Sequence, residues 1–353
     1  MPASSVHFNG SVNLADAETV MREIATRIPS GVRRIPDGET GDRGNWIFFQ
    51  MQKFLQTPGL VQAGSHDQPG EGYDQMPQVR LADGASADDV VWPDLGYADA
   101  YLASFETFRR LQDDGTIPAA ARFQMQYPTP LASIAAWIVP EDQQSLAPSY
   151  ETALFADLDR LLAAVQHDQV AVQWDVAVEF GLLVGGFDTG PRSFDAIAAS
   201  LARCVDAVPA DVPVGLHLCY GDYGHQHFVQ PESLELQVRV VNAVVDAAAR
   251  DVSWFSFTVP QNQDAESYFA PLRELLAAAS TELYFALVPY HPDDQPAGTT
   301  ERQTSLIDDN LAQVPSGRRD WGICTECGLG RAEEAEVPGL LDLHRELTAP
   351  AAP

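Results

Sequence analysis

Short apolar runs alternate along the chain with longer amphipathic segments. The short runs are predicted as strands: Val6–Val12, Val32–Ile35, Arg122–Gln126, Val170–Asp175, Val214–Cys219, Trp254–Val259, Leu283–Val288 and Trp321–Cys324. Between most of them, apolar residues recur at the spacing of a helix face: Ala17–Ile28, Tyr150–Val165, Phe194–Val208, Leu234–Ala249, Tyr268–Ala278 and Glu301–Val314. Eight strands that alternate with helices are typical of an α/β protein of the (β/α)8, or TIM barrel, class.

An open, doubly wound sheet is the alternative α/β fold. That fold usually carries a Gly-x-Gly-x-x-Gly turn after its first strand, and no such turn follows Val6–Val12. We therefore favour the barrel, and we predict that residues 1–353 form one domain.

One region departs from the alternation of strands and helices. Residues 56–89 are rich in Gly, Pro, Asp and Gln, and an apolar helical stripe follows over Tyr97–Asp113. We interpret residues 56–115 as a long inserted loop and helix region after the second strand. Loops of this length are uncommon in a folded domain unless they act as lids or are disordered.

The composition limits the classes of partner. The chain has 50 Asp and Glu residues against 21 Lys and Arg, with Lys53 as its single lysine, and its formal net charge is −29. An acidic surface repels phosphate backbones and anionic lipids, so no nucleic-acid or membrane partner is expected. The N-terminal residues do not resemble a signal peptide, and no apolar run reaches the roughly 18 residues of a membrane span. A cytoplasmic location is expected, where cysteines more often bind metals than form disulfides.

Three residues predict a metal site. His217 and Cys219 alternate on one predicted strand, so both side chains leave the same face, about 7 Å apart along the backbone. Cys327 follows another predicted strand and precedes a glycine. One imidazole and two thiols are a donor set that suits Zn²⁺. A buried, hydrogen-bonded histidine with a small apolar cysteine remains the alternative for His217 and Cys219. Cys324 and Cys327 also have the Cys-x-x-Cys spacing of a redox pair.

Polar residues gather where the predicted strands end, the position of active sites in barrels. They are Ser11, Glu39, Arg43, Thr129, Asp175, Glu179, His217, Cys219 and Cys327. Glu39, Asp175 and Glu179 are the candidates for catalytic carboxyl groups. Each of these carboxyl groups could instead be a structural partner of an arginine in a charged loop or in the barrel.

Taken in order, these patches resemble the catalytic barrel of cobalamin-independent methionine synthase, in its short, single-barrel, methionine synthase II-like form. That group is related to uroporphyrinogen decarboxylase-like barrels. The resemblance covers essentially the whole chain and rests on Gly10-Ser11, Asp37-Gly38-Glu39 with Arg43, Pro128-Thr129-Pro130, Gln173-Trp174-Asp175, His217-x-Cys219 and Cys327-Gly328-Leu329.

The resemblance implies a zinc ion that binds the thiol of a substrate and presents a thiolate to a methyl donor. The metal ligands would be His217, Cys219 and Cys327. The residues implied to bind the substrate are Ser11, Glu39, Arg43, Thr129 and Asp175, with Ser11 and Glu39 holding the carboxylate and ammonium of an amino acid.

The sequence departs from the synthases in two ways. The synthases use a glutamate ligand after the sixth strand, where this chain has no carboxylate between Phe255 and Pro260. Glu326, Glu179 and Asp222 are candidates to replace it. The N-terminal half with which full-length synthases hold folate is also missing.

Three functions stay open at this stage. The first is a zinc-dependent methyl or alkyl transferase that acts on a small thiol, with a small-molecule alkyl donor that the sequence does not specify. The second is a zinc hydrolase or lyase whose open metal position holds water. The third is a metal-free barrel that decarboxylates or only binds a small ligand. A homodimer is neither favoured nor excluded.

Overall fold

The structure is a computed structural model that describes residues 5–66, 76–186, 193–222, 226–317 and 320–348. Residues 67–75, which belong to the predicted insertion, lie outside this described part.

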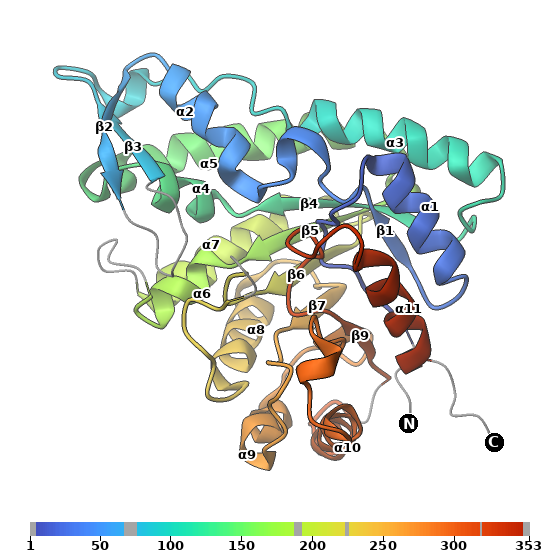
Figure 1. Ribbon diagram of the computed structural model, residues 1–353. Helices are drawn as coiled ribbons and strands as arrows, with labels where there is room; N and C mark the ends of the chain where they lie inside the picture. Colours follow the sequence, from blue (N-terminus) through green and yellow to red (C-terminus); the bar gives the residue numbers. More distant parts are fainter. Residues whose placement is uncertain (1–4, 67–75, 187–192, 223–225, 318–319, 349–353) are drawn as a thin grey trace.

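A curled sheet of seven parallel strands occupies the centre of the molecule (Figure 1). Its strands, in spatial order, are β1 (Arg34–Pro36), β4 (Arg122–Pro128), β5 (Val170–Val176), β6 (Val214–Leu218), β7 (Trp254–Phe257), β8 (Glu282–Ala286) and β9 (Gly322–Cys324). Almost all strand residues are buried. Parallel strands covered by helices have no solvent-facing side, which explains their continuous apolar runs in the sequence.

The predicted first strand, Val6–Val12, is not a regular strand. Val6 forms isolated parallel bridges with Val32, next to β1, and with Ile323 in β9. The prediction of a closed eight-stranded barrel is therefore wrong in its first strand: the described sheet has seven strands, and the segment between its edges contributes single bridges. Gly10 has a φ angle of +130°, which interrupts the extended backbone that a longer strand would need.

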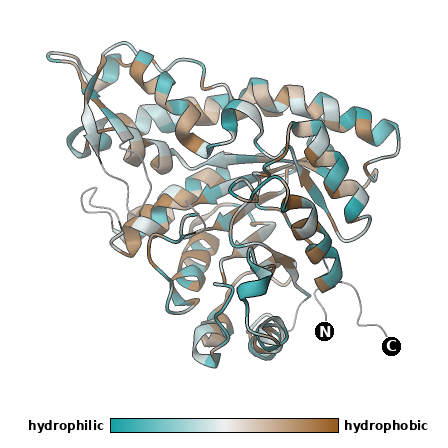
Figure 2. Ribbon diagram, in the orientation of Figure 1, coloured by the Kyte–Doolittle hydropathy of each residue, from teal (hydrophilic) through white to brown (hydrophobic). Residues whose placement is uncertain are grey.

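Helices cover the outside of the sheet (Figure 1). The longer ones are α1 (Ala17–Arg27), α3 (Tyr97–Asp113), α5 (Pro140–Leu162), α7 (Phe194–Asp206), α8 (Glu235–Ala247), α10 (Thr299–Leu311) and α11 (Val337–Thr348). In α7, for example, Ile197, Leu201 and Val205 recur at one face and are buried. Figure 2 shows the matching alternation of hydrophilic and hydrophobic residues along the helices.

The insertion between β1 and β4 contains more structure than the sequence predicted. It holds α2 (Met51–Gln56) and an antiparallel hairpin of β2 (Leu60–His66) and β3 (Met76–Leu81), followed by α3. The helical part was predicted correctly, whereas the hairpin was predicted as a loop because its polar residues hide the strand pattern. The nitrogen of Val139 donates to the carbonyl of Val79 at 3.0 Å, which ties the hairpin to the start of α5.

Three further helices differ from the prediction. The helix predicted at Tyr150–Val165 is α5, which begins earlier, at Pro140. The segment Tyr268–Ala278 was predicted as one helix, but α9 (Glu266–Phe269) passes into a 3-10 helix at Ala270–Glu274. Pro271 lies at this junction and has no N–H to continue the helix. The short α4 (Pro130–Trp137) was not predicted, because all of its residues are buried and no polar face marks it.

The remaining short helix is α6 (Val178–Leu183), which follows β5 directly. No helix in the described ranges is long and apolar enough to cross a membrane.

Candidate metal centre

The ends of β5 and β6 place Asp175 and His217 side by side, because the two residues are register partners in the parallel sheet. The His217 Nδ1 atom lies 3.4 Å from Asp175 Oδ1, and its Nε2 atom lies 3.3 Å from the carbonyl oxygen of Glu326. His217 is only 3% exposed. A carboxylate on one ring nitrogen commonly orients a histidine whose other nitrogen binds a metal.

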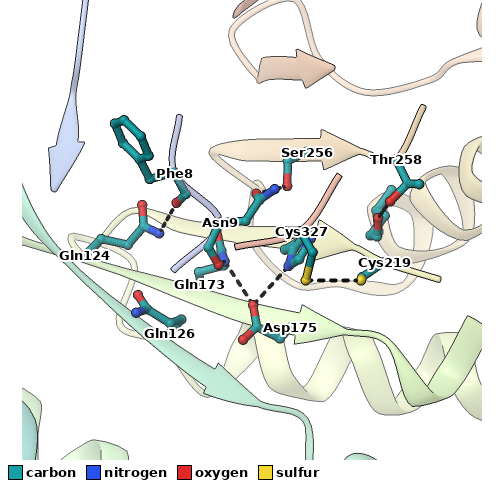
Figure 3. Close-up of polar contacts among 12 residues, drawn as sticks. Phe8, Asn9, Gln124, Gln126, Gln173, Asp175, Cys219, Ser256, Thr258 and Cys327 are labelled. Carbon is teal, nitrogen blue, oxygen red and sulfur yellow. Dashed lines mark hydrogen bonds and ion pairs between the residues drawn. The ribbon is translucent and has the colours of Figure 1, made fainter. Parts of the chain in front are cut away.

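Two sulfur atoms meet beside this imidazole. The Sγ atoms of Cys219 and Cys327 lie 3.6 Å apart, and both cysteines are free thiols (Figure 3). One donor atom each from His217, Cys219 and Cys327 lie within 4.8 Å of one another. Two thiolates on one tetrahedral zinc, each about 2.3 Å from the metal, would be about 3.8 Å apart. The observed sulfur spacing therefore fits ligands that share a cation, and it is far longer than a disulfide bond.

The turn after β9 holds Cys327 in place. The hydroxyl of Tyr290 accepts from the Cys327 nitrogen at 3.0 Å and donates to the Gly328 carbonyl at 2.7 Å. A Cβ atom at Gly328 would lie 2.3 Å from Ser11 Oγ, so only glycine lets the turn pass Ser11. This packing puts Ser11 beside the cysteine turn, although the two are far apart in sequence.

The three candidate ligands shift one another's pKa values. Burial lowers the pKa of His217, but the Cys219 thiolate and the hydrogen bond to Asp175 outweigh it and raise the pKa to about 10. The hydrogen bond with Cys327 lowers the pKa of Cys219, and the His217 charge helps bring it to about 6 against the effect of burial. The same hydrogen bond, together with burial, raises the pKa of Cys327. A divalent cation would displace these protons, since metals bind the deprotonated ligands.

Glu39 is a second buried acidic group near Asp175. Its φ angle is +51°, an uncommon conformation for a residue with a side chain, and its nitrogen donates to Asp37 Oδ1 at 3.0 Å. Burial and, after it, the charge of Asp175 raise the pKa of Glu39. A bound cationic group such as an ammonium would offset the charge of Asp175 and favour the ionised form of Glu39.

Arg43 is anchored beneath this acidic pair. Its Nη2 atom donates to Asp37 Oδ2, and its guanidinium lies over the ring of Tyr101, 4.5 Å from the centroid. Asp37 also accepts from Ser104 Oγ at 2.7 Å. The other terminal nitrogen of Arg43, Nη1, is buried without a hydrogen-bond partner. The role of Arg43 in substrate binding stays a prediction. Its unpaired Nη1 atom could donate a hydrogen bond to a substrate.

Thr129 and Glu179 contact each other. The Thr129 hydroxyl donates to Glu179 Oε1 and also accepts from the Ala132 nitrogen at 3.3 Å, which caps α4. Both side chains are fully buried. Their predicted roles, substrate binding for Thr129 and catalysis for Glu179, stay predictions.

The candidate replacements for the missing glutamate do not join the cluster in the described residues. Glu326 is held away from it: Oε1 accepts from the Gln261 nitrogen at 2.9 Å, and Oε2 lies 2.7 Å from His227 Nε2. Thr258 follows β7, and its hydroxyl donates to the Leu218 carbonyl at 2.7 Å. A hydroxyl engaged in this way locks neighbouring strands together and supplies no carboxylate.

Asn9 joins several buried groups next to Asp175, although it was not among the predicted site residues. Its side chain donates to the Thr325 carbonyl at 2.8 Å and accepts from Ser256 Oγ at 2.8 Å. Gln173 Nε2 donates to the Asn9 carbonyl at 2.8 Å and to Asp175 Oδ1 at 2.9 Å (Figure 3). Asn9 precedes Gly10-Ser11 in the first apolar run, so its position at a strand end was the only available signal.

Comparison with known proteins supports the fold. No family model matches the chain, and no curated protein matches it. A solved structure from Listeria monocytogenes, provisionally assigned as a vitamin-B12 independent methionine synthase, matches with a TM-score of 0.54. The two sequences are 13% identical, and the match covers 94% of this chain and 86% of that chain. At this identity the similarity establishes a shared fold and no more.

Proposed function

We infer that the protein is a zinc-dependent transferase that moves a methyl or other alkyl group onto a small thiol. The observation that carries this proposal is the convergence of His217, Cys219 and Cys327 at the carboxyl ends of the strands. The fold shared with the Listeria protein supports it. We also regard the seven-stranded sheet, with the bridging segment between its edges, as an irregular form of the (β/α)8 barrel.

Three protein ligands suit this reaction. Zinc held by them would supply a Lewis acid that deprotonates a coordinating thiol at neutral pH. Cys219 and Cys327 as thiolates balance the charge of a divalent ion, and a tetrahedral ion with three protein ligands keeps a fourth position open. Asp175 orients His217 at the far side of the ring.

The acidic pair, Glu39 and Asp175, would bind the polar end of a substrate. Glu39 and Asp175 are 5% and 6% exposed and interact with each other. A substrate with an ammonium group would satisfy both carboxyl groups, and its sulfur would then reach the metal ligands. We therefore propose an amino-acid thiol as acceptor.

Thiol transfer is a better fit than hydrolysis. A zinc hydrolase needs an ionised general base beside a bound water. The raised pKa of Glu39 disfavours its ionised form, and Glu179 accepts a hydrogen bond from Thr129. Asp175 hydrogen-bonds with Gln173 and His217, which is the arrangement of an orienting group.

Metal analysis combined with a thiol assay tests the proposal. The purified protein should contain about one zinc per chain, and Cys219→Ser should lose it, whereas Cys204→Ser, in buried α7, should retain it. The zinc protein should consume the free thiol of L-homocysteine in the presence of methyl donors drawn from sulfonium, N-methyl pterin and alkyl halide compounds. A folded, zinc-free preparation with the same thiol-consuming rate would contradict the proposal.

A further inference from the structure

Gln126 on β4 is buried without a hydrogen-bond partner. Its side chain is 0% exposed, and neither Oε1 nor Nε2 has a partner. Buried amides in folded proteins are almost always hydrogen-bonded, because an unpaired donor or acceptor loses its water without compensation. An amide with both ends unpaired is therefore a sign that something outside the chain completes it.

The neighbouring glutamines have partners within the chain that Gln126 lacks. Gln124, two residues earlier on β4, donates through Nε2 to the Phe8 carbonyl at 2.7 Å, and only its Oε1 is unpaired. Gln173, the register partner of Gln126 on β5, is bonded at both ends, to His7 at 2.8 Å and to Asn9 and Asp175. Figure 3 shows dashed contacts from Gln124 and Gln173 and none from Gln126.

Gln126 lies on the face of β4 that is next to Asp175 and the residues before Ser11. Residues two apart on a strand point to the same face, and Pro128, two residues after Gln126, is the register partner of Asp175. A Cβ atom at Gly10 would lie 2.8 Å from Gln126 Cγ and 3.1 Å from Nε2, so the amide lies directly against the backbone before Ser11. The unpaired amide thus lies close to Gly10, the residue before Ser11, one side-chain layer below Asp175 in the sheet register.

We propose that Gln126 binds the polar end of the thiol substrate, with Nε2 donating to its carboxylate and Oε1 accepting from its ammonium. The proposal rests on the proposed function and assigns to that site a residue that positions the substrate. Gln126 carries a donor and an acceptor on one neutral group, so a single amide can contact both charges of a zwitterion. The acceptor is accordingly an α-amino acid with a thiol, and a plain alkyl thiol lacks the groups that Gln126 needs.

Thiol binding to the cobalt-substituted protein tests this inference without any turnover. Co²⁺ reports each new sulfur ligand by its charge-transfer absorption, so titrations with L-homocysteine and with 1-propanethiol yield two dissociation constants. Gln126→Met keeps the volume and removes both polar atoms. It should weaken L-homocysteine binding by about 10-fold, the effect of losing one or two hydrogen bonds, and leave 1-propanethiol binding unchanged.

Gln124→Met is the matched control on the same strand and face. It removes the bond to the Phe8 carbonyl, so it should lower the unfolding temperature and leave the ratio of the two dissociation constants unchanged. Gln126→Met should instead keep or raise the unfolding temperature of the ligand-free protein, because it removes an unpaired buried amide. If Gln126 had only a structural role, Gln126→Met would lower the unfolding temperature and leave the ratio of the two dissociation constants unchanged.

The outcomes separate the two proposals. If wild-type protein binds both thiols and Gln126→Met weakens neither, or weakens both equally, the assignment of Gln126 is wrong and the transferase proposal stands. If the unfolding temperature falls in Gln126→Met while L-homocysteine binding is unchanged, the amide has only an internal partner such as a trapped water, and the assignment is again wrong. If the wild-type cobalt protein binds neither thiol, both proposals fail.

Discussion

The two ends of the parallel sheet treat buried polar groups differently. At the amino ends, Arg34 is 5% exposed, donates to Glu282 at 2.5 Å and to Tyr284 at 2.9 Å, and lies over the ring of Trp254, 4.0 Å from its centroid. At the carboxyl ends, an imidazole and two sulfurs converge, and an acidic pair lies close by. The carboxyl end also holds a buried pair of opposite charges, Arg43 with Asp37, but it adds thiols and an acidic pair that a cation or a zwitterion would complete.

The contrast separates stability from function. At the amino end the charge of the buried arginine is balanced by its own carboxylate partner, so we expect this pair to contribute to stability. The carboxyl end keeps clustered carboxyl groups, thiols and an unpaired amide at the expense of stability, which is typical of sites that bind a ligand. Substitutions at the two ends should therefore change different measured quantities.

The largest effect is expected from Cys327→Ser. Replacing a thiolate by a hydroxyl removes a strong ligand and one negative charge, so zinc affinity should fall by at least about 100-fold. Competition with a chromophoric chelator measures this affinity. Cys324→Ser, three residues earlier and in β9, is the matched control and should keep the metal. Equal zinc affinity in the two variants would remove Cys327 from the ligand set.

Arg34→Met should affect the opposite end. It leaves Glu282 partly buried without its main partner, and breaking a buried ion pair from one side costs about 3–5 kcal/mol. Urea unfolding should show this loss of stability, while zinc content stays at the wild-type level. Loss of zinc in a folded Arg34→Met protein would show that the two ends are not independent.

Asp175→Asn tests whether Asp175 supports metal binding through His217. The hydrogen bond that the Asp175 carboxylate accepts from His217 should orient the ring, so its loss should lower zinc affinity by about 10–100-fold. The chelator competition assay applies here too. An unchanged affinity would mean that Asp175 acts on the substrate alone.

The smallest effect concerns acid stability. The pKa of Glu282 is about 2: burial raises it, but Arg34, by charge and by hydrogen bond, lowers it more. A carboxyl group with a depressed folded pKa stabilises the fold above its unfolded pKa, and this contribution is lost as the pH falls through the folded value. Wild type should therefore exceed Glu282→Gln in stability at pH 6, and the gap should shrink from about pH 4.5 to pH 2. A gap that does not depend on pH would contradict the assigned ion pair.

The sequence predicted the elements whose signal is local. His217 and Cys219 lie two apart on a strand, so their common face follows from strand geometry alone. The helix at Tyr97–Asp113 was likewise predicted to the residue, since its apolar stripe is regular. The hairpin of β2 and β3 was missed, because its polar residues hide the apolar alternation by which a strand is recognised.

Other features depend on distant contacts and could not be read from the chain. The segment around Gly10 lies between the edge strands β1 and β9, and the positive φ angle of Gly10 makes it irregular. The engagement of Glu326 by Gln261 and His227 removes a candidate ligand that spacing alone had left open. The unpaired state of Gln126 emerges only once its neighbours have taken their own partners.

X-ray absorption at the zinc edge, before and after addition of L-homocysteine, tests the central claim most directly. The zinc protein should show two sulfur neighbours and at least one nitrogen neighbour, from Cys219, Cys327 and His217, and thiol addition should raise the sulfur count to three. A zinc shell without two sulfurs, or a sulfur count that the thiol leaves unchanged, would contradict the account.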